Sequence, residues 1–151
     1  MKLILLGVLF SILPVLELRA GLPLLYAGGL PLWTALLVAV GLNILAFPIT
    51  YLFLNYLHKR LTNFRHYEHL FRRIEERYKR KIEHRIGTEW EYIALFVFVM
   101  IPLPGTGAYS GALISWIFNL DKMKGFLAVT LGVIAAGVLV LLVMLGAITI
   151  F

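Results

Sequence analysis

Two charged side chains lie in an apolar stretch near the start of the chain. Glu17 and Arg19 occur in Ile12-Leu-Pro-Val-Leu-Glu-Leu-Arg-Ala-Gly21, a segment that Pro14 interrupts. An ionisable group in hydrocarbon costs on the order of 3 kcal/mol or more, so it is usually paired, faces a wet cavity and serves a function. We therefore expect Glu17 and Arg19 to belong to a substrate or ion site. A purely structural contact of Glu17, with Arg19 or with the backbone, is the alternative.

A second interrupted stretch, Ile101-Pro-Leu-Pro-Gly-Thr-Gly107, lies about ninety residues later. Prolines lack amide hydrogens, and the glycines let free backbone N–H groups of the following helix point into a cavity, where the helix dipole favours an anion. Thr106 adds a hydroxyl group. The predicted binding residues of the two stretches, with one polar residue from the helix between them, are Pro14, Glu17, Arg19, Asn43, Pro102, Pro104, Gly105, Thr106 and Gly107.

The composition identifies an integral membrane protein. Of 151 residues, 61% are hydrophobic and only 15% are charged, far from the average of soluble domains. The absence of cysteine excludes disulfides and thiolate chemistry. No nucleophile–base pair and no metal-ligand set is evident, so we expect no catalytic residue, no metal, no cofactor and no enzymatic activity.

Basic residues concentrate in one segment. Ten of the 14 Lys and Arg residues, all four histidines and four of the eight acidic residues lie between His58 and Gly87. The positive-inside rule places this segment in the cytoplasm. Its periodicity predicts an amphipathic helix that lies on anionic lipid or pairs with another subunit. Nothing else resembles a nucleic-acid-binding module, so no nucleic acid is expected.

The chain divides into two membrane repeats, 1–57 and 88–151, joined by the basic segment 58–87. In the first, a broken hairpin (1–33) precedes a transmembrane helix (34–57); in the second, a hairpin (88–120) precedes a helix (125–150). We expect the helix of residues 1–16 to be too short for a full span of about twenty residues, and the next half-helix to begin at Gly21. Asn43 and Pro48 either mark a tolerated kink or line the cavity that faces Glu17.

These repeats predict an inverted, all-α, polytopic architecture. An odd number of membrane crossings separates the two hairpins, so the first would enter from outside and the second from inside as re-entrant hairpins. Paired broken hairpins that meet at the midplane are typical of transporters.

Both broken stretches carry a resemblance to a known family. Leu13-Pro14-Val-Leu-Glu17-Leu-Arg19-Ala-Gly21 and Pro102-Leu-Pro104-Gly105-Thr106-Gly107-Ala108 resemble the two signature segments of the small multidrug export proteins. That family is in turn similar to the DedA-type membrane proteins, which share paired re-entrant hairpins and are implicated in moving lipid phosphates. The resemblance implies a transporter.

Two transport functions and one other function are consistent with the sequence. The resemblance favours export of drugs or other small molecules, for which Glu17 would bind an organic cation; helix N-termini with Arg19 suit an anionic lipid phosphate instead. A non-transporting scaffold that docks a partner through the basic helix is the third alternative. Expected partners are membrane lipid, a coupling proton or Na+, and further copies of the chain in a homo-oligomer in the cell membrane.

Overall fold

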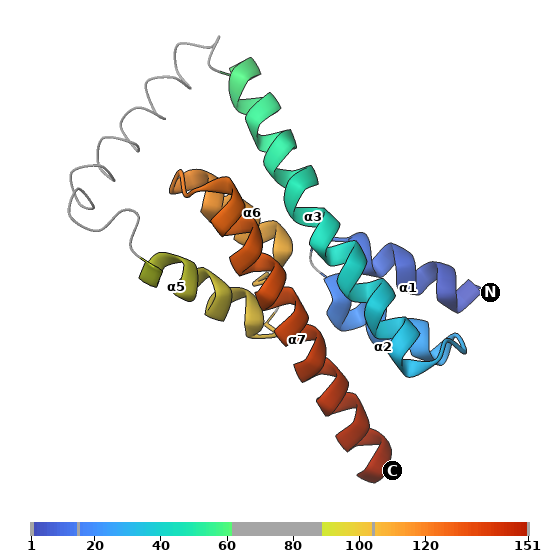
Figure 1. Ribbon diagram of the computed structural model, residues 1–151. Coiled ribbons are helices and arrows are strands. Elements are labelled where there is room, and N and C mark those ends of the chain that lie inside the picture. Colours follow the sequence, from blue (N-terminus) through green and yellow to red (C-terminus); the bar gives the residue numbers. More distant parts are fainter. Residues whose placement is uncertain (1, 15, 62–88, 104, 151) are drawn as a thin grey trace.

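The computed structural model describes residues 2–14, 16–61, 89–103 and 105–150. Within these ranges the regular elements are all helices: α1 (Lys2–Ile12), α2 (Glu17–Ala27), α3 (Leu32–Leu61), α5 (Glu89–Met100), α6 (Ala108–Ile117) and α7 (Lys122–Ile150) (Figure 1). The expected basic amphipathic helix lies outside the described residues except at its start, and Pro104 also lies outside them. The all-α fold class is confirmed.

Two helices are long and apolar enough to cross a membrane. Leu32–His58 within α3 and Lys122–Gly146 within α7 comprise 27 and 25 residues, more than the roughly twenty that a span requires. The two helices contact each other and run in opposite directions (Figure 1). Their outer faces carry large apolar side chains such as Leu52 and Val143, which suit contact with lipid. The protein is therefore a membrane protein.

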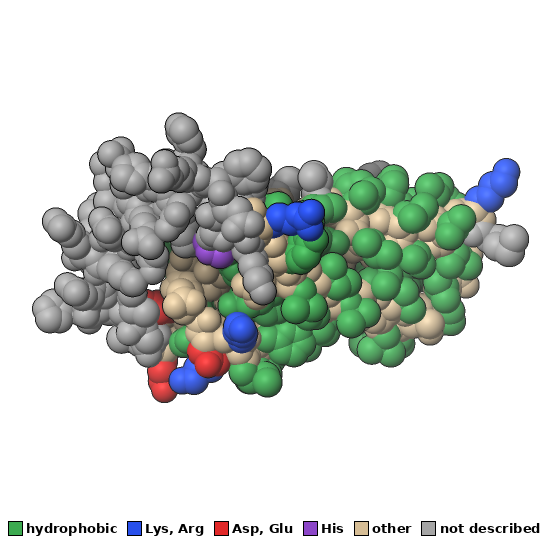
Figure 2. Space-filling view, turned by 90° about the horizontal axis from the view of Figure 1, so that it is seen from above, with side chains coloured by type: hydrophobic (Ala, Val, Ile, Leu, Met, Phe, Trp, Pro, Cys, Tyr) green, Lys and Arg blue, Asp and Glu red, His purple; other side chains and the backbone are tan. Residues whose placement is uncertain are grey.

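Apolar and charged side chains lie on different parts of the surface. Over the coloured part of Figure 2, hydrophobic side chains cover most of the visible face, charged side chains gather toward one end, and one further basic side chain lies at the opposite end. A soluble protein of this size would interleave charged and apolar groups over its surface, because exposed apolar patches favour association. The distribution fits an apolar middle section between two polar ends.

Each half of the chain contains the same succession of helices. Two short helices separated by a loop are followed by a tight turn and a long helix. In the first turn, the N–H of Leu30 bonds to the carbonyl of Leu25; ninety residues later, the N–H of Leu120 bonds to the carbonyl of Ser115. The companion bonds of both turns keep this spacing, and each turn contains one residue with positive φ, Gly29 or Asn119.

The buried positions repeat with the same ninety-residue spacing. In α2 the buried residues Leu18, Gly21, Leu22 and Leu25 match the buried Ala108, Gly111, Ala112 and Ser115 of α6. In α3 the buried residues Ala35, Ala39, Asn43, Ala46, Phe47 and Tyr51 match Gly125, Val129, Val133, Ala136, Gly137 and Leu141 of α7. Corresponding helices therefore pack through corresponding faces.

The first break is shorter than the sequence suggested. We expected the half-helix after it to begin at Gly21, but α2 begins at Glu17, so that Gly21 and Pro23 lie inside a helix. Gly21 serves close packing instead: a Cβ atom there would lie 1.9 Å from the Ser11 hydroxyl oxygen of α1. At 11 residues, or about 16 Å, α1 is too short to span a bilayer.

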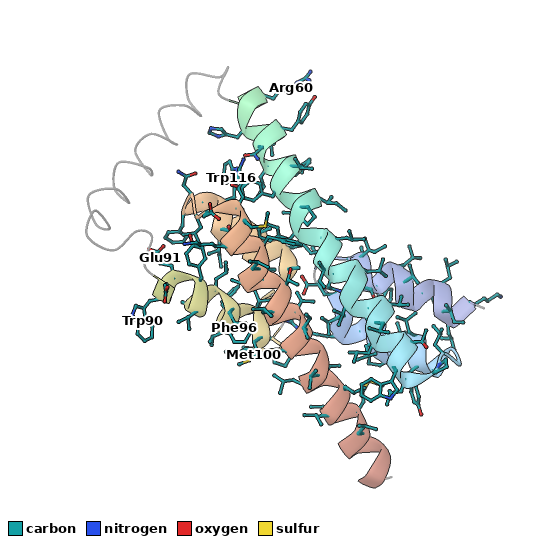
Figure 3. The ribbon with its side chains drawn as sticks, viewed as in Figure 1. Arg60, Trp90, Glu91, Phe96, Met100 and Trp116 are labelled. Carbon is teal, nitrogen blue, oxygen red and sulfur yellow. The ribbon has the colours of Figure 1, made fainter. Side chains whose placement is uncertain are left out.

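Close packing of α5 on α7 provides a first test of the fold. Phe96 and Met100 lie about one helical turn apart on α5 (Figure 3). Gly132 of α7 approaches the same helix so closely that a Cβ atom at position 132 would lie 2.8 Å from the Cβ of Val99. Because the carbonyl of Phe96 is also only 3.0 Å away, Gly132→Ala must push the helices apart. We expect a lower melting temperature in detergent, partly restored in Gly132→Ala/Val99→Ala; a Gly132→Ala protein as stable as wild type would contradict this packing.

Candidate functional site

The two loops that follow the first helix of each half meet at the carboxylate of Glu17. Glu17 is the first residue of α2. Its backbone φ of 49° is a left-handed conformation that residues other than glycine rarely adopt, and the residue is 2% exposed. Its carboxylate lies against Gly107, where a Cβ atom would be 1.4 Å from Glu17 Oε2. No residue other than glycine fits at position 107 while the carboxylate stays in this place.

This carboxylate lies at the N-terminus of α6. The residue that caps α6, Gly107, supplies no side-chain acceptor, and the first N–H groups of a helix have no partner within it. The backbone amide of Tyr109, in the first turn of α6, stabilises the negative charge of the Glu17 carboxylate, as does the positive end of the helix dipole. The other oxygen, Oε1, is buried without a hydrogen-bond partner. The carboxylate of Glu17, from the first half of the chain, thus occupies the place where the N-terminus of α6, in the second half, favours an anion.

Arg19 reaches the second loop rather than Glu17. Its Nη2 atom donates to Thr106 Oγ1 at 2.9 Å and lies 3.4 Å from the carbonyl oxygen of Ile101. Its Nη1 atom is buried without a partner. Glu17 and Arg19 attract each other electrostatically, but the hydrogen bonds of Arg19 within the described residues go to the second loop. The hydrogen bonds of Arg19 therefore join the first half of the chain to the second loop and do not form a direct pair with Glu17.

Thr106 organises the second loop. Its hydroxyl oxygen lies 2.6 Å from the carbonyl of Ile101 and 2.9 Å from that of Leu103, and it accepts the Leu103 N–H at 3.3 Å. One hydroxyl proton serves one carbonyl at a time, while the lone pairs accept from Leu103 and Arg19. The loop continues through Gly105, whose φ of 86° requires glycine and whose carbonyl accepts a hydrogen bond from the Ser110 hydroxyl.

Tyr109 is a site residue that the sequence analysis missed. Its phenolic hydroxyl donates to the carbonyl of Ile12, the last residue of α1, and its backbone amide stabilises the charge of Glu17. The available signal was a polar tip on an otherwise apolar half-helix, two residues after the Gly107 that ends the motif. Aromatic residues are common in membrane helices, so this signal did not distinguish a contact across the two halves from an interface anchor.

The remaining predicted site residues are arranged less closely around the carboxylate. Pro14 and Pro102 are exposed in the two loops. Asn43 is fully buried on α3 and donates from Nδ2 to the carbonyls of Ser11, at 3.1 Å, and Ala39, at 3.0 Å. The bond to Ser11 holds the end of α1 against α3, whereas the bond to Ala39 lies within α3. Its Oδ1 atom has no hydrogen-bond partner.

The contact of Asn43 with α1 predicts a cost in stability rather than in ligand binding. Asn43→Leu removes the donor and leaves the Ser11 carbonyl buried and unpaired, which costs about 1–3 kcal/mol. We expect a lower melting temperature with little change in affinity for a ligand at Glu17, both measured on purified protein. A loss of affinity at unchanged stability would instead place Asn43 in the binding site.

The polar groups that the structure describes at the site are suited to binding charge. Over the helices and loops that the structure describes, no group of three His, Cys, Asp or Glu side chains could hold a metal ion. What the geometry offers is a buried carboxylate and a guanidinium group, each with one unpaired atom, between loops from the two halves. Such an arrangement can bind and release a charged ligand or a proton.

Comparison with known proteins identifies the family. No curated protein and no solved structure matches the chain. A family model described as "Putative small multi-drug export protein" matches residues 17–139, a range that begins at Glu17, includes the second loop and contains most of both long helices. Because this match covers well over half of the chain, the protein belongs to the small multi-drug export protein family.

Proposed function

We propose that the chain exports small organic cations, with the Glu17 carboxylate as the group that binds the substrate or a coupling proton. The buried position of this carboxylate carries the proposal. The anion-binding N-terminus of α6 is already filled by Glu17, so an anionic substrate would have to displace it. A cation instead finds a carboxylate oxygen, Oε1, without a partner. This argument and the family description favour the same substrate class.

The orientation of the two halves follows from the basic end of the molecule. Lys122 and Lys124, at the start of α7, lie over the rings of Tyr51 and Tyr92, and Arg60 lies near the end of α3. Trp116 of α6 joins this end of α3 through a hydrogen bond to Asn55 (Figure 3). Lys and Arg favour the cytoplasmic side, so α3 ends and α7 begins there.

With this orientation the two halves become inverted repeats. The turn between α2 and α3 faces outside, and the equivalent turn between α6 and α7 faces the cytoplasm. Each short helix pair is then a re-entrant hairpin, with its loop directed toward the middle of the membrane, where Glu17 meets Gly107. Backbone without helical partners is tolerated at that depth only where it is buried in protein or lines a cavity. The continuation of the basic segment 58–87 in the cytoplasm, and a homo-oligomer, remain expectations of the same arrangement.

Binding at Glu17 would alter the contact between the halves. A cation or a proton on the carboxylate weakens its attraction for the N-terminus of α6, because that attraction depends on the negative charge. The substrate and the proton compete for the same oxygen atoms, so protons on the far side can displace the substrate there. This competition is the simplest coupling that the site allows, with Na+ as the other candidate ion.

An anionic lipid phosphate is the second candidate substrate, and one observation favours it. Arg19 Nη1 is buried without a partner, and a guanidinium group is well suited to binding phosphate oxygens. The scaffold function depends on residues outside the described part of the chain and gains no support from the site.

Ligand binding to the purified protein distinguishes these functions. The two labelled ligands are tetraphenylphosphonium and a short-chain phosphatidic acid, and each is measured with wild type, Glu17→Gln and Arg19→Ala. We expect the cation to bind wild type, to bind more weakly as the pH falls because protons compete, and to be lost in Glu17→Gln. Phosphatidic acid binding that disappears in Arg19→Ala would favour the lipid function; binding of neither ligand would overturn both.

A further inference from the structure

Two hydrogen bonds that cross between the halves come from donors at equivalent positions. Tyr109 of α6 donates to the carbonyl of Ile12, at the end of α1. Arg19 of α2 points its Nη2 atom at the carbonyl of Ile101, directly after the end of α5, at 3.4 Å. Tyr109 lies ninety residues after Arg19, the same spacing that relates the turns and buried faces of the two halves. Equivalent donors therefore contact the ends of the first helices of the opposite halves, at acceptors that differ by one residue in this spacing.

The carbonyl groups at the end of a helix need hydrogen-bond donors from elsewhere. The last carbonyls of a helix have no N–H partner within the helix, and at membrane depth water does not replace it. Tyr109 of the second half supplies such a donor to Ile12. Arg19 of the first half adds one to Ile101, whose carbonyl also accepts from Thr106 and Leu103 of its own loop. The contacts therefore hold the end of α1 against α6, and the residue that follows α5 against α2.

We propose that Tyr109 and Arg19 are the two gates of the transport pathway, each closing the site toward one face of the membrane. The proposal rests on the transport function and on the inverted arrangement proposed above. A two-fold axis in the membrane plane exchanges the two faces, so the contacts that it relates have exchanged faces as well. Both contacts are formed in this structure, which is thus closed toward both sides.

The two gates differ in strength and in their connection to the site. Arg19 carries a permanent charge and is also held by Thr106 at 2.9 Å, whereas Tyr109 makes a neutral hydrogen bond to Ile12. The backbone amide of Tyr109 also stabilises the charge of the Glu17 carboxylate, which lies against the neighbouring Gly107. A ligand on Glu17 therefore weakens the hold on the start of α6 and with it the Tyr109 gate. Substrate binding opens the Tyr109 gate and leaves the Arg19 gate closed.

Accessibility of the loops tests the proposal. The cysteine-free chain allows single reporters at Leu13→Cys in the first loop and Leu103→Cys in the second, labelled with a membrane-impermeant maleimide from either face of oriented vesicles. Without substrate, we expect Tyr109→Phe to raise labelling about fivefold from one face and Arg19→Gln to raise it from the opposite face, because phenylalanine has no hydroxyl donor and glutamine is shorter than arginine and uncharged. Thr106→Val, which removes the partner of Arg19, should resemble Arg19→Gln and replaces it should that variant fail to fold.

Each outcome decides the proposal separately from the transport function. Increased labelling from the same face in both variants, or no increase in either variant, would contradict the proposal that Tyr109 and Arg19 are gates. The labelling needs no substrate, so opposite-face labelling combined with unchanged cation export in Glu17→Gln would keep the gates and reject Glu17 as the binding group. Export that depends fully on Glu17, without labelling from opposite faces, would keep Glu17 as the binding group and reject the gates.

Discussion

Gly107→Ala is expected to abolish export, with a loss on the order of a hundredfold. The new methyl group would occupy the position of the Glu17 carboxylate, 1.4 Å from Oε2 and 2.0 Å from Cδ, so the carboxylate must leave the N-terminus of α6. Displacement of a binding group by an ångström or more typically has an effect of this size. The measurement is export of tetraphenylphosphonium from proteoliposomes, compared at equal amounts of folded protein.

Gly41→Ala is the matched control for this prediction. Gly41 lies within α3, and no atom lies within 4 Å of a Cβ built there. Alanine favours a helix over glycine by about 1 kcal/mol, so the control should keep full export and melt at the same or a higher temperature. Equal export by Gly107→Ala and Gly41→Ala would show that the carboxylate does not need its place beside Gly107.

Glu17→Gln is expected to lower export to the background rate while leaving the protein folded. Glutamine retains the size of the side chain and an acceptor for the Tyr109 N–H, but it has no negative charge to bind a cation. Removing a buried charge that has one unpaired oxygen relieves a cost of burial. The melting temperature should therefore be unchanged or higher, and the combination of lost export and retained stability is the specific signature.

Glu89→Gln makes the same chemical change at an exposed residue. Glu89 lies in the first turn of α5, at the opposite end of that helix from the second loop, and its side chain is exposed. We expect normal export from this variant. A loss of export in both variants would point to a general effect of charge on the assay, and normal export in Glu17→Gln would reject the carboxylate as the substrate or proton site.

The sequence predicted the charged and glycine-rich parts of the site because their residue types are unusual in a membrane segment. Glu17, Arg19 and Thr106 were identified from polarity alone, and the structure brings all three to the same pair of loops. The functional role of these residues remains a proposal. The two long helices followed from length and hydropathy, which depend little on tertiary context.

Other features depend on contacts between distant segments, and local patterns did not show them. Gly21 was interpreted as a helix breaker, but it lies inside α2 because α1 approaches there through Ser11. Tyr109 gave no local signal for its bond to Ile12, which lies 97 residues away. A contact of Arg19 with Glu17 was only one of the alternatives that the sequence left open, and the sequence does not reveal that Thr106, 87 residues away, reaches the guanidinium group.

Cross-linking of positions 17 and 107 tests most directly the central claim, that loops from the two halves meet at one site. In the double variant Glu17→Cys/Gly107→Cys, the smaller side chain at position 17 leaves room for a thiol at position 107, and the two Cβ atoms lie within about the 4.5 Å that a disulfide allows. The control is Glu17→Cys/Gly41→Cys, because no Glu17 atom lies within 4 Å of a Cβ at position 41. We predict rapid disulfide formation under mild oxidation in the first variant only, detected by mass spectrometry of the joined peptides. Absence of the disulfide in both variants, or equal formation in both, would contradict the meeting of the two loops.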